Sequence, residues 1–252
     1  MKKLLFTLMI LTLYSCEGTI LDYDENKEYI ENKKNITYYM GTPFSGTIIR
    51  KEGFYRDRKS KTTYKNGKKD GLYEEYYKDI IMKDGEVKDG QVKIKETYKN
   101  GEEDGLYEEY YEDGQLRIKT TYKNGEEDGL YEEYYENGQL ILKENYKNGV
   151  LDGLYEYYYE NGQLSLKENY KNGKEDGLYE SYYEDGQLKK KMFFINGVLD
   201  GLYEEYGEYG QVKLKTTYKN GLLDGLYEEY GEDAFGPTII KENYKNGEII
   251  YD

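Results

Sequence analysis

A unit of 24 residues repeats almost letter for letter along most of this 252-residue chain. One clear copy runs from Lys119 to Leu142 and reads KTTYKNGEEDGLYEEYYENGQLIL. Its Asp-Gly-Leu-Tyr core places a glycine at seven positions: Gly71, Gly105, Gly129, Gly153, Gly177, Gly201 and Gly225. Neighbouring glycines of this set are 24 residues apart, except that a ten-residue insertion separates the first two. Such a chain folds as an array of stacked units rather than as one globule.

Composition alone would favour disorder, because the chain is 35% charged, carries a net charge of -15 and is only 37% hydrophobic. Its 35 tyrosines reverse this interpretation. Each ring can bury a large apolar body while its hydroxyl stays in water. Regular Asn-Gly and Asp-Gly pairs also mark tight turns. We therefore expect an ordered, tyrosine-rich β structure.

The first turn of a repeat sets a hairpin register. The pair at 113–114 favours a two-residue type I′ turn, which requires positive φ at both residues. This turn predicts that Tyr111 lies opposite Leu116 and that Glu109 lies opposite Ile118.

The second turn tests that register. A type I′ turn at Asn124-Gly125 places Ile118 opposite Tyr131 and Arg117 opposite Glu132. Both registers assign these residues to the same faces, although a slip of one residue would exchange them. The sequence predicts an all-β, elongated antiparallel meander of about seven to eight hairpin repeats. The glycines expected in these turns are Gly114, Gly125, Gly138, Gly149, Gly162 and Gly173.

Tyrosine rows along this sheet are the candidate binding surface. They can serve the fold's own packing, or an exposed row can bind protein or glycan, because tyrosine gives contact area at low entropy cost. The centre of the array, residues 157–159, is its most aromatic stretch. The candidate residues are Tyr107, Tyr111, Tyr131, Tyr135, Tyr155, Tyr157, Tyr158, Tyr159, Tyr179 and Tyr183.

The N-terminus is typical of an exported lipoprotein. Lys2 and Lys3 precede an apolar run over 4–13, which is too short to span a bilayer. Cys16, the only cysteine, stands where a bacterial lipobox has the residue that receives a diacylglyceryl lipid. A cleaved signal without a lipid and a buried strand are the alternatives. With one cysteine the chain forms no internal disulfide.

These features divide the chain into three parts. Residues 1–15 are the expected lipoprotein signal peptide, and 16–35 the lipid-anchored cysteine with a flexible tether. Residues 36–252 are the repeat array, with a degenerate first repeat at 36–60 and regular repeats over 61–247. The insertion at 80–89 is most simply an enlarged hairpin tip.

Catalytic chemistry is not indicated. The chain has no histidine, which removes the commonest general base and metal ligand. A carboxylate repeated in every unit is also a poor candidate for a single catalytic acid. We expect no enzyme activity, no metal and no cofactor beyond the acyl lipid on Cys16. The negative net charge disfavours nucleic acid.

The repeat motifs GLYEEYYExGQL and YKNGxxDG resemble the bacterial variant of the MORN repeat, close to the repeats of proteins labelled YwqK-type antitoxins. This resemblance covers about residues 42–247. It implies an antiparallel β-repeat fold and a protein-interaction role.

Three functions follow as hypotheses. The first is an envelope lipoprotein, on the outer membrane if the cell has two, whose array is a scaffold for an unknown protein partner. The second is an antitoxin-like neutralising partner of a toxin. The third is a cell-wall or glycan-binding repeat protein.

The lipobox is testable by one substitution. Cys16→Ser removes the thiol that accepts the lipid, and each acyl CH₂ lost from the bilayer removes about 0.8 kcal/mol of membrane affinity. We expect the variant to leave the detergent phase in phase partitioning, whereas the wild-type protein stays there. Unchanged partitioning would exclude lipidation at Cys16.

Overall fold

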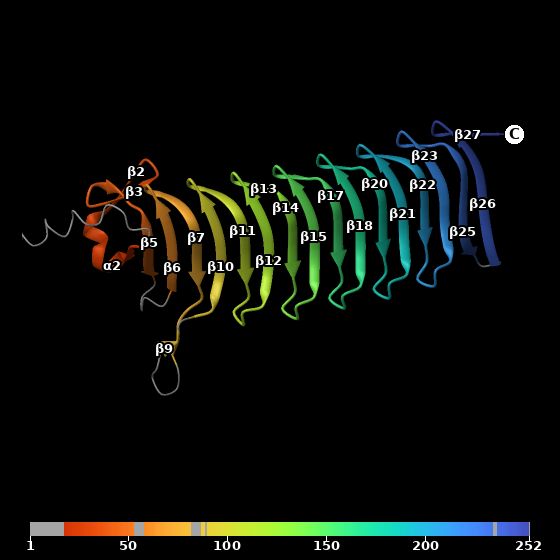
Figure 1. Ribbon diagram of the computed structural model, residues 1–252. Helices are drawn as coiled ribbons and strands as arrows, with labels where there is room; N and C mark the ends of the chain where they lie inside the picture. Colours follow the sequence, from red (N-terminus) through yellow and green to blue (C-terminus); the bar gives the residue numbers. More distant parts are fainter. Residues whose placement is uncertain (1–17, 53–57, 82–86, 89, 234–235, 252) are drawn as a thin grey trace, which may run out of the picture. The chain divides into compact units, whose positions relative to one another are not determined.

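A computed structural model describes residues 18–52, 58–81, 87–88, 90–233 and 236–251. The expected signal peptide and Cys16 lie outside these residues. The chain forms two compact units, one of residues 1–116 with 121–126, the other of 117–120 with 127–252. Nearly all elements are β-strands joined in antiparallel ladders (Figure 1), which confirms the predicted all-β meander of repeats.

The elements of the first unit are, in order, β1 (Ile20–Asp22), α2 (Tyr23–Asn26), η1 (Lys27–Tyr29), β2 (Ile30–Lys33), β3 (Ile36–Tyr39), β4 (Thr42–Pro43), β5 (Gly46–Glu52), β6 (Arg58–Lys65), β7 (Lys68–Tyr76), β8 (Ile80–Ile81), β9 (Val87–Lys88), β10 (Val92–Lys99) and β11 (Glu102–Tyr110). Strands β12 (Leu116–Lys123) and β13 (Glu126–Glu127) are divided between the units.

The second unit continues with β14 (Gly129–Tyr134), β15 (Leu140–Lys147), β16 (Val150–Leu151), β17 (Gly153–Tyr158), β18 (Leu164–Lys171), β19 (Lys174–Glu175), β20 (Gly177–Tyr182), β21 (Leu188–Ile195), β22 (Val198–Tyr206), β23 (Val212–Lys219), β24 (Leu222–Leu223), β25 (Gly225–Asp233), β26 (Gly236–Lys245) and β27 (Glu248–Ile250). Each repeat contributes one long hairpin, and β8 and β9 form a short ladder inside the 80–89 insertion.

The N-terminal segment is folded, so the prediction of a flexible tether is wrong for residues 18–35. Strand β1 pairs in parallel with β5, and Asp22 caps the short helix α2 by accepting a 2.9 Å hydrogen bond from the Asp24 amide. The buried apolar cluster of the described residues lies here: Leu21, Ile30, Phe44 and Ile48. A terminal repeat needs such a cap because no further repeat covers its edge.

The Asn-Gly turns have positive φ at both residues, as a type I′ turn requires: 52° at Asn124 and 81° at Gly125. The register beyond these turns differs from the prediction. Ile118 pairs with Glu133 instead of Tyr131, and Glu132 pairs with Lys119 instead of Arg117.

A bulge at each Asp-Gly explains the slip of two residues. The Asp152 amide donates a 2.8 Å hydrogen bond to the Asn145 carbonyl, and the ladder resumes two residues later, with Leu142 opposite Tyr157. Because side chains alternate with a period of two, this slip keeps Ile118 and Glu133 on one face and Lys119 and Glu132 on the other, as predicted.

The other turns are not of type I′, so that prediction is wrong for Gly114, Gly138 and Gly162. Only the glycine has positive φ there, 80° at Gly138, while Asn137 accepts a 2.9 Å hydrogen bond from the Gln139 amide through its side chain. Asn137 therefore does not have the positive φ of a type I′ turn, and the register shifts by one residue beside this turn.

The bulge also shifts the pairing at the tip. Tyr134, not Tyr135, lies opposite Leu140, so the predicted pairing of Tyr111 with Leu116 does not hold in the equivalent hairpin. The Tyr135 amide instead donates to the Gln139 carbonyl at 2.8 Å.

Two glycine substitutions separate backbone strain from crowding. Gly153 has φ +132°, and an added Cβ would lie 2.9 Å from the Asn145 Cβ, whereas Gly125, at φ +81°, has nothing within 4 Å. Gly153→Ala should therefore cost about 1–3 kcal/mol and lower Tm by roughly 2–4 °C per kcal/mol. Gly125→Ala should lower Tm less, and thermal unfolding by circular dichroism measures both. An equal loss would contradict the crowding at the bulge.

Candidate interaction surface

Each hairpin presents two different faces. Cα partners across an antiparallel ladder share a face, so Tyr131 lies with Glu144, and Glu133 with Leu142. We call this side the aromatic face and the other the charged face. The leading row of the aromatic face holds Tyr73, Tyr107, Tyr131, Tyr155, Tyr179, Tyr203 and Tyr227.

Rings of the leading row pack against rings on the neighbouring strand. Tyr131 and Tyr146 have ring centroids 6.5 Å apart at 70°, and Tyr155 and Tyr170 6.1 Å apart at 54°. Edge-to-face pairs of this kind contribute about 0.5–1.5 kcal/mol beyond burial. Pairs also form between Tyr107 and Tyr122 and between Tyr179 and Phe194. These candidate residues therefore take part in packing the fold.

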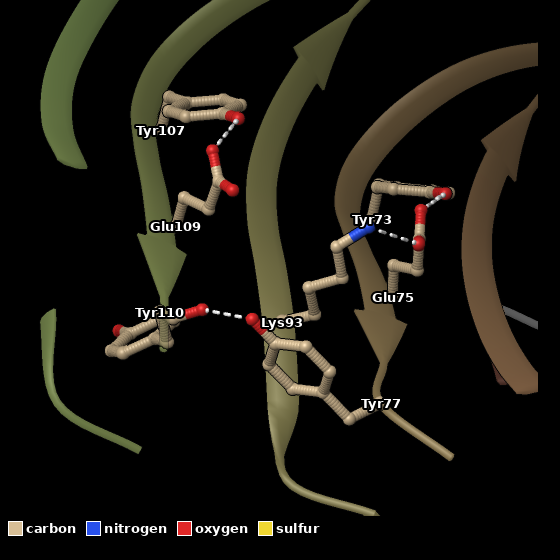
Figure 2. Close-up of polar contacts among 7 residues, drawn as sticks. All are labelled: Tyr73, Glu75, Tyr77, Lys93, Tyr107, Glu109 and Tyr110. Carbon is tan, nitrogen blue, oxygen red and sulfur yellow. Dashed lines mark hydrogen bonds and ion pairs between the residues drawn. The ribbon is translucent and has the colours of Figure 1, made fainter. Parts of the chain in front are cut away.

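The hydroxyls of this row donate to glutamates on their own strand. Figure 2 shows Tyr73 donating to Glu75 at 3.2 Å and Tyr107 to Glu109 at 3.3 Å. Lys93 also contacts Glu75, with its Nζ 3.2 Å from Oε1. Burial raises the pKa of Tyr131 to about 12, so this phenol stays protonated at neutral pH.

A second row ties each repeat to the next. The Tyr77 hydroxyl donates to the Tyr110 carbonyl at 2.7 Å (Figure 2), and the Tyr159 hydroxyl to the Tyr182 carbonyl at 2.8 Å. The hydroxyl of Tyr135 bonds to the Tyr158 carbonyl and that of Tyr183 to the Tyr206 carbonyl. Tyr111 occupies the same repeat position. This row, which we call the tyrosine straps, is structural.

The three central tyrosines do not form one strip. Tyr157 lies on the aromatic face and is 38% exposed. Tyr158 lies on the charged face, where its hydroxyl donates to Glu156 at 3.1 Å, and Tyr159 is a strap. Of the predicted hot spot, only Tyr157 offers an exposed ring.

The charged face balances its own charge. Lys167 lies 3.5 Å from Glu156, Lys191 lies 3.0 Å from Glu180, and the same positions recur as Lys215 and Glu204 at 3.1 Å. Half-exposed pairs contribute little to stability, about 0–1 kcal/mol each. Their effect is to neutralise the negative charge of the glutamates on the charged face.

Sequence reasoning missed the glutamates of the aromatic face. Burial, with the charge of Glu144, raises the pKa of Glu127, and burial is also the main cause of the raised pKa of Glu144 and Glu168. Tyr146 donates to Glu144 at 2.9 Å. Glu168 is only 7% exposed, and its Oε2 has no hydrogen-bond partner. The sequence did contain a signal that this position is buried, because threonine occupies the Glu168 position in other repeats, as at Thr216.

Comparison with known families supports the repeat assignment. Five consecutive segments match the family model described as MORN repeat variant: residues 103–124, 127–148, 151–172, 175–196 and 199–220. The predicted resemblance over 42–247 is thus found for its central part. MORN repeats are in general repeats that interact with proteins or membranes. A comparison with curated proteins gave no match.

Within the described ranges, no cluster of three or more acidic, histidine or cysteine side chains could hold a metal ion. In that same part of the chain, no helix is long and apolar enough to cross a bilayer.

Buried Glu168 makes stability depend on pH. Its pKa is raised in the folded protein, so the folded state binds more protons, and stability falls as pH rises above the unfolded value of about 4.3. Glu168→Gln removes this charge and should raise Tm at pH 7–8, with the gain shrinking towards pH 4. Exposed Glu160→Gln is the control and should change Tm little. A variant less stable than wild type at pH 8 would show that the carboxylate is satisfied.

Proposed function

We propose that this protein is a non-catalytic interaction scaffold, held at a bacterial membrane by a lipid on Cys16. The observation that supports it is the aromatic face, where successive repeats present the tyrosine of the leading row at the same register position, as at Tyr131, Tyr155 and Tyr179. A partner that contacts several repeats gains from each copy without needing a pocket.

Tyr157 is the proposed contact residue for the partner. Its side chain is 38% exposed and its hydroxyl bonds to that of Tyr135, whereas Tyr155 and Tyr159 are engaged in a ring pair and a strap. Tyr157 stands where most repeats have glutamate, such as Glu133 and Glu205. The fold does not require an aromatic ring at this position, since other copies form the same hairpin without one. An exposed tyrosine of this kind suits protein recognition.

Affinity capture tests this function. The full-length protein, immobilised in mild detergent, is exposed to envelope extract and cytosol of the native cell, and bound proteins are identified by mass spectrometry. Tyr157→Ser is the test variant. Tyr158→Ser is the matched control, because it changes the neighbouring residue on the opposite face.

The scaffold predicts an envelope protein that binds the wild-type protein and the Tyr158 variant but not the Tyr157 variant. A cytosolic toxin-like protein with the same pattern would instead favour the antitoxin-like hypothesis. Retention of isolated cell-wall glycan, with no protein captured, would favour the wall-binding hypothesis. A partner that binds all three proteins equally would contradict the role of Tyr157.

A further inference from the structure

The residues that flank each Asn-Gly turn vary between copies, although the backbone of the turn is the same. In each turn, the residue before the asparagine and the residue after the glycine are Cα partners on the charged face. Lys99 pairs in this way with Glu102 in the first unit, and Lys245 pairs with Glu248 in the second. A glutamate opposite a lysine balances the charge at this position.

Four consecutive turns of the second unit lack this glutamate. We call their flanking residues the central turn row, which consists of the opposed pairs Lys147 with Val150, Lys171 with Lys174, Ile195 with Val198, and Lys219 with Leu222. The row therefore holds four lysines, four apolar side chains and no carboxylate. The whole chain, by contrast, has a net charge of -15.

The lysines of the central turn row have no carboxylate opposite them. Lys171 and Lys174 lie directly across the ladder from each other, and like charges at opposed positions are destabilising. Among the ion pairs of the described residues, none involves a lysine of the row. An anionic group from outside the chain would therefore relieve this repulsion.

Aspartates near these turns already have other partners. The Asp200 carboxylate accepts a 2.8 Å hydrogen bond from the Asn220 amide, and Asp176 accepts a turn amide in the same way. Asp224 forms an ion pair with Lys245, outside the row, at 3.1 Å. These contacts hold the aspartates against the turns, so they do not form ion pairs with the lysines of the row.

The apolar side chains of the row are exposed where other copies carry charge. Val150, Ile195, Val198 and Leu222 are 43%, 45%, 44% and 50% exposed. Ile195 stands where the other copies have lysine, and Phe193, two residues earlier on the same face, stands where they have threonine or asparagine. The fold does not require apolar residues there, since the other copies form the same hairpin without them. Neighbouring exposed apolar side chains of this kind mark an interaction surface.

We propose that the central turn row binds a segment of a partner protein in which acidic residues lie on both sides of an apolar residue. The apolar residue packs on Ile195, Val198 and Phe193. The acidic residues pair with the lysines of the neighbouring turns. This surface is separate from the aromatic face, so the inference goes beyond the proposed function and does not depend on it.

The position of the lysines matches such a segment. Lys171, Ile195 and Lys219 occupy the same position in three successive repeats. Equivalent positions are two strands apart, so a cation lies about 9.6 Å from Ile195 on each side. An extended chain covers this distance in about three residues. An acidic residue about three places before the apolar residue and another about three places after it can therefore reach both lysines.

Charge distinguishes this partner from two other occupants. A second copy of the chain, docked through the same row about a two-fold axis, would bring eight lysines together without a carboxylate, because each row holds four. An anionic membrane would be attracted by the lysines of the row, but it extends over the chain and meets its net charge of -15. A short acidic segment meets only the row.

Three peptides test the chemistry of the segment. The probe is fluorescein-labelled Glu-Glu-Asp-Leu-Phe-Ile-Asp-Glu-Glu. One control replaces the three apolar residues by serine, and the other replaces every acidic residue by lysine. Each is titrated with the full-length protein in mild detergent at low ionic strength, where ion pairs are least screened, and binding is measured by anisotropy. We expect the probe to bind at least about tenfold more tightly than either control, whereas the net charge of the chain alone would favour the lysine peptide.

Two variants with the same change in charge locate the binding. Val198→Glu with Leu222→Glu introduces the glutamate that other copies have, as at Glu248, so the hairpins should fold. Gln139→Glu with Gln163→Glu adds the same charge at exposed positions of the turns at the opposite ends of the hairpins. We expect the first variant to bind the probe at least about tenfold more weakly than wild type and the second to bind it normally. Thermal unfolding verifies that both are folded.

Tighter binding of the lysine peptide, equal binding of the serine peptide, or full binding by the Val198→Glu, Leu222→Glu variant would overturn the proposal. Sedimentation with vesicles of equal parts phosphatidylserine and phosphatidylcholine tests the membrane, with Cys16→Ser in every protein to exclude a lipid anchor. Vesicle binding that the first variant loses, without binding of the probe, would assign the row to the membrane and also overturn the proposal. The affinity capture with Tyr157→Ser concerns the aromatic face, so either surface can fail without the other.

Discussion

The edge-to-face contact between aromatic rings on neighbouring strands is the interaction on which the array depends. The buried apolar cluster among the described residues sits near the N-terminus, around Phe44 and Ile48. Among the described residues beyond this cluster, no large apolar side chain is fully buried. Ring pairs such as Tyr203 with Tyr218, 5.7 Å apart, supply in each repeat the contact that a core supplies elsewhere. The tyrosine straps and the bulge at each Asp-Gly then fix the position of one ring pair relative to the ring pair of the next repeat.

Much of this arrangement could be predicted from local sequence rules. Asn-Gly demands positive φ at two residues, and the period of two in tyrosine and leucine fixes the faces. The type of the turn at Asn137-Gly138 was predicted wrongly because the Asn137 side chain accepts a hydrogen bond from the Gln139 amide. This contact competes with the type I′ conformation. The two-residue register slip at Asp152 was not predicted because it depends on the hydrogen bond from the Asp152 amide to the Asn145 carbonyl across the ladder.

The candidate interaction surface could likewise be predicted only in part. Periodicity identified the tyrosine rows, but it could not distinguish a ring that packs from one that is free. That distinction depends on which acceptor each tyrosine hydroxyl bonds, as in the hydrogen bond from Tyr159 to the Tyr182 carbonyl. The glutamates were overlooked because charge in a sequence suggests solvent. Glu168 is buried by the tyrosines around it, and their proximity is a property of the folded repeat.

The tyrosine straps have a direction. Each hydroxyl reaches forward to the main-chain carbonyl of the following copy, an acceptor that any residue provides. At the next two copies of this position, Gly207 and Gly231 stand in place of tyrosine. Each repeat needs only a main-chain carbonyl of the next repeat as its hydrogen-bond acceptor. Repeats between Tyr77 and Tyr183 can therefore be duplicated or deleted without a compensating substitution elsewhere. The length of the array can therefore change by whole repeats through recombination alone.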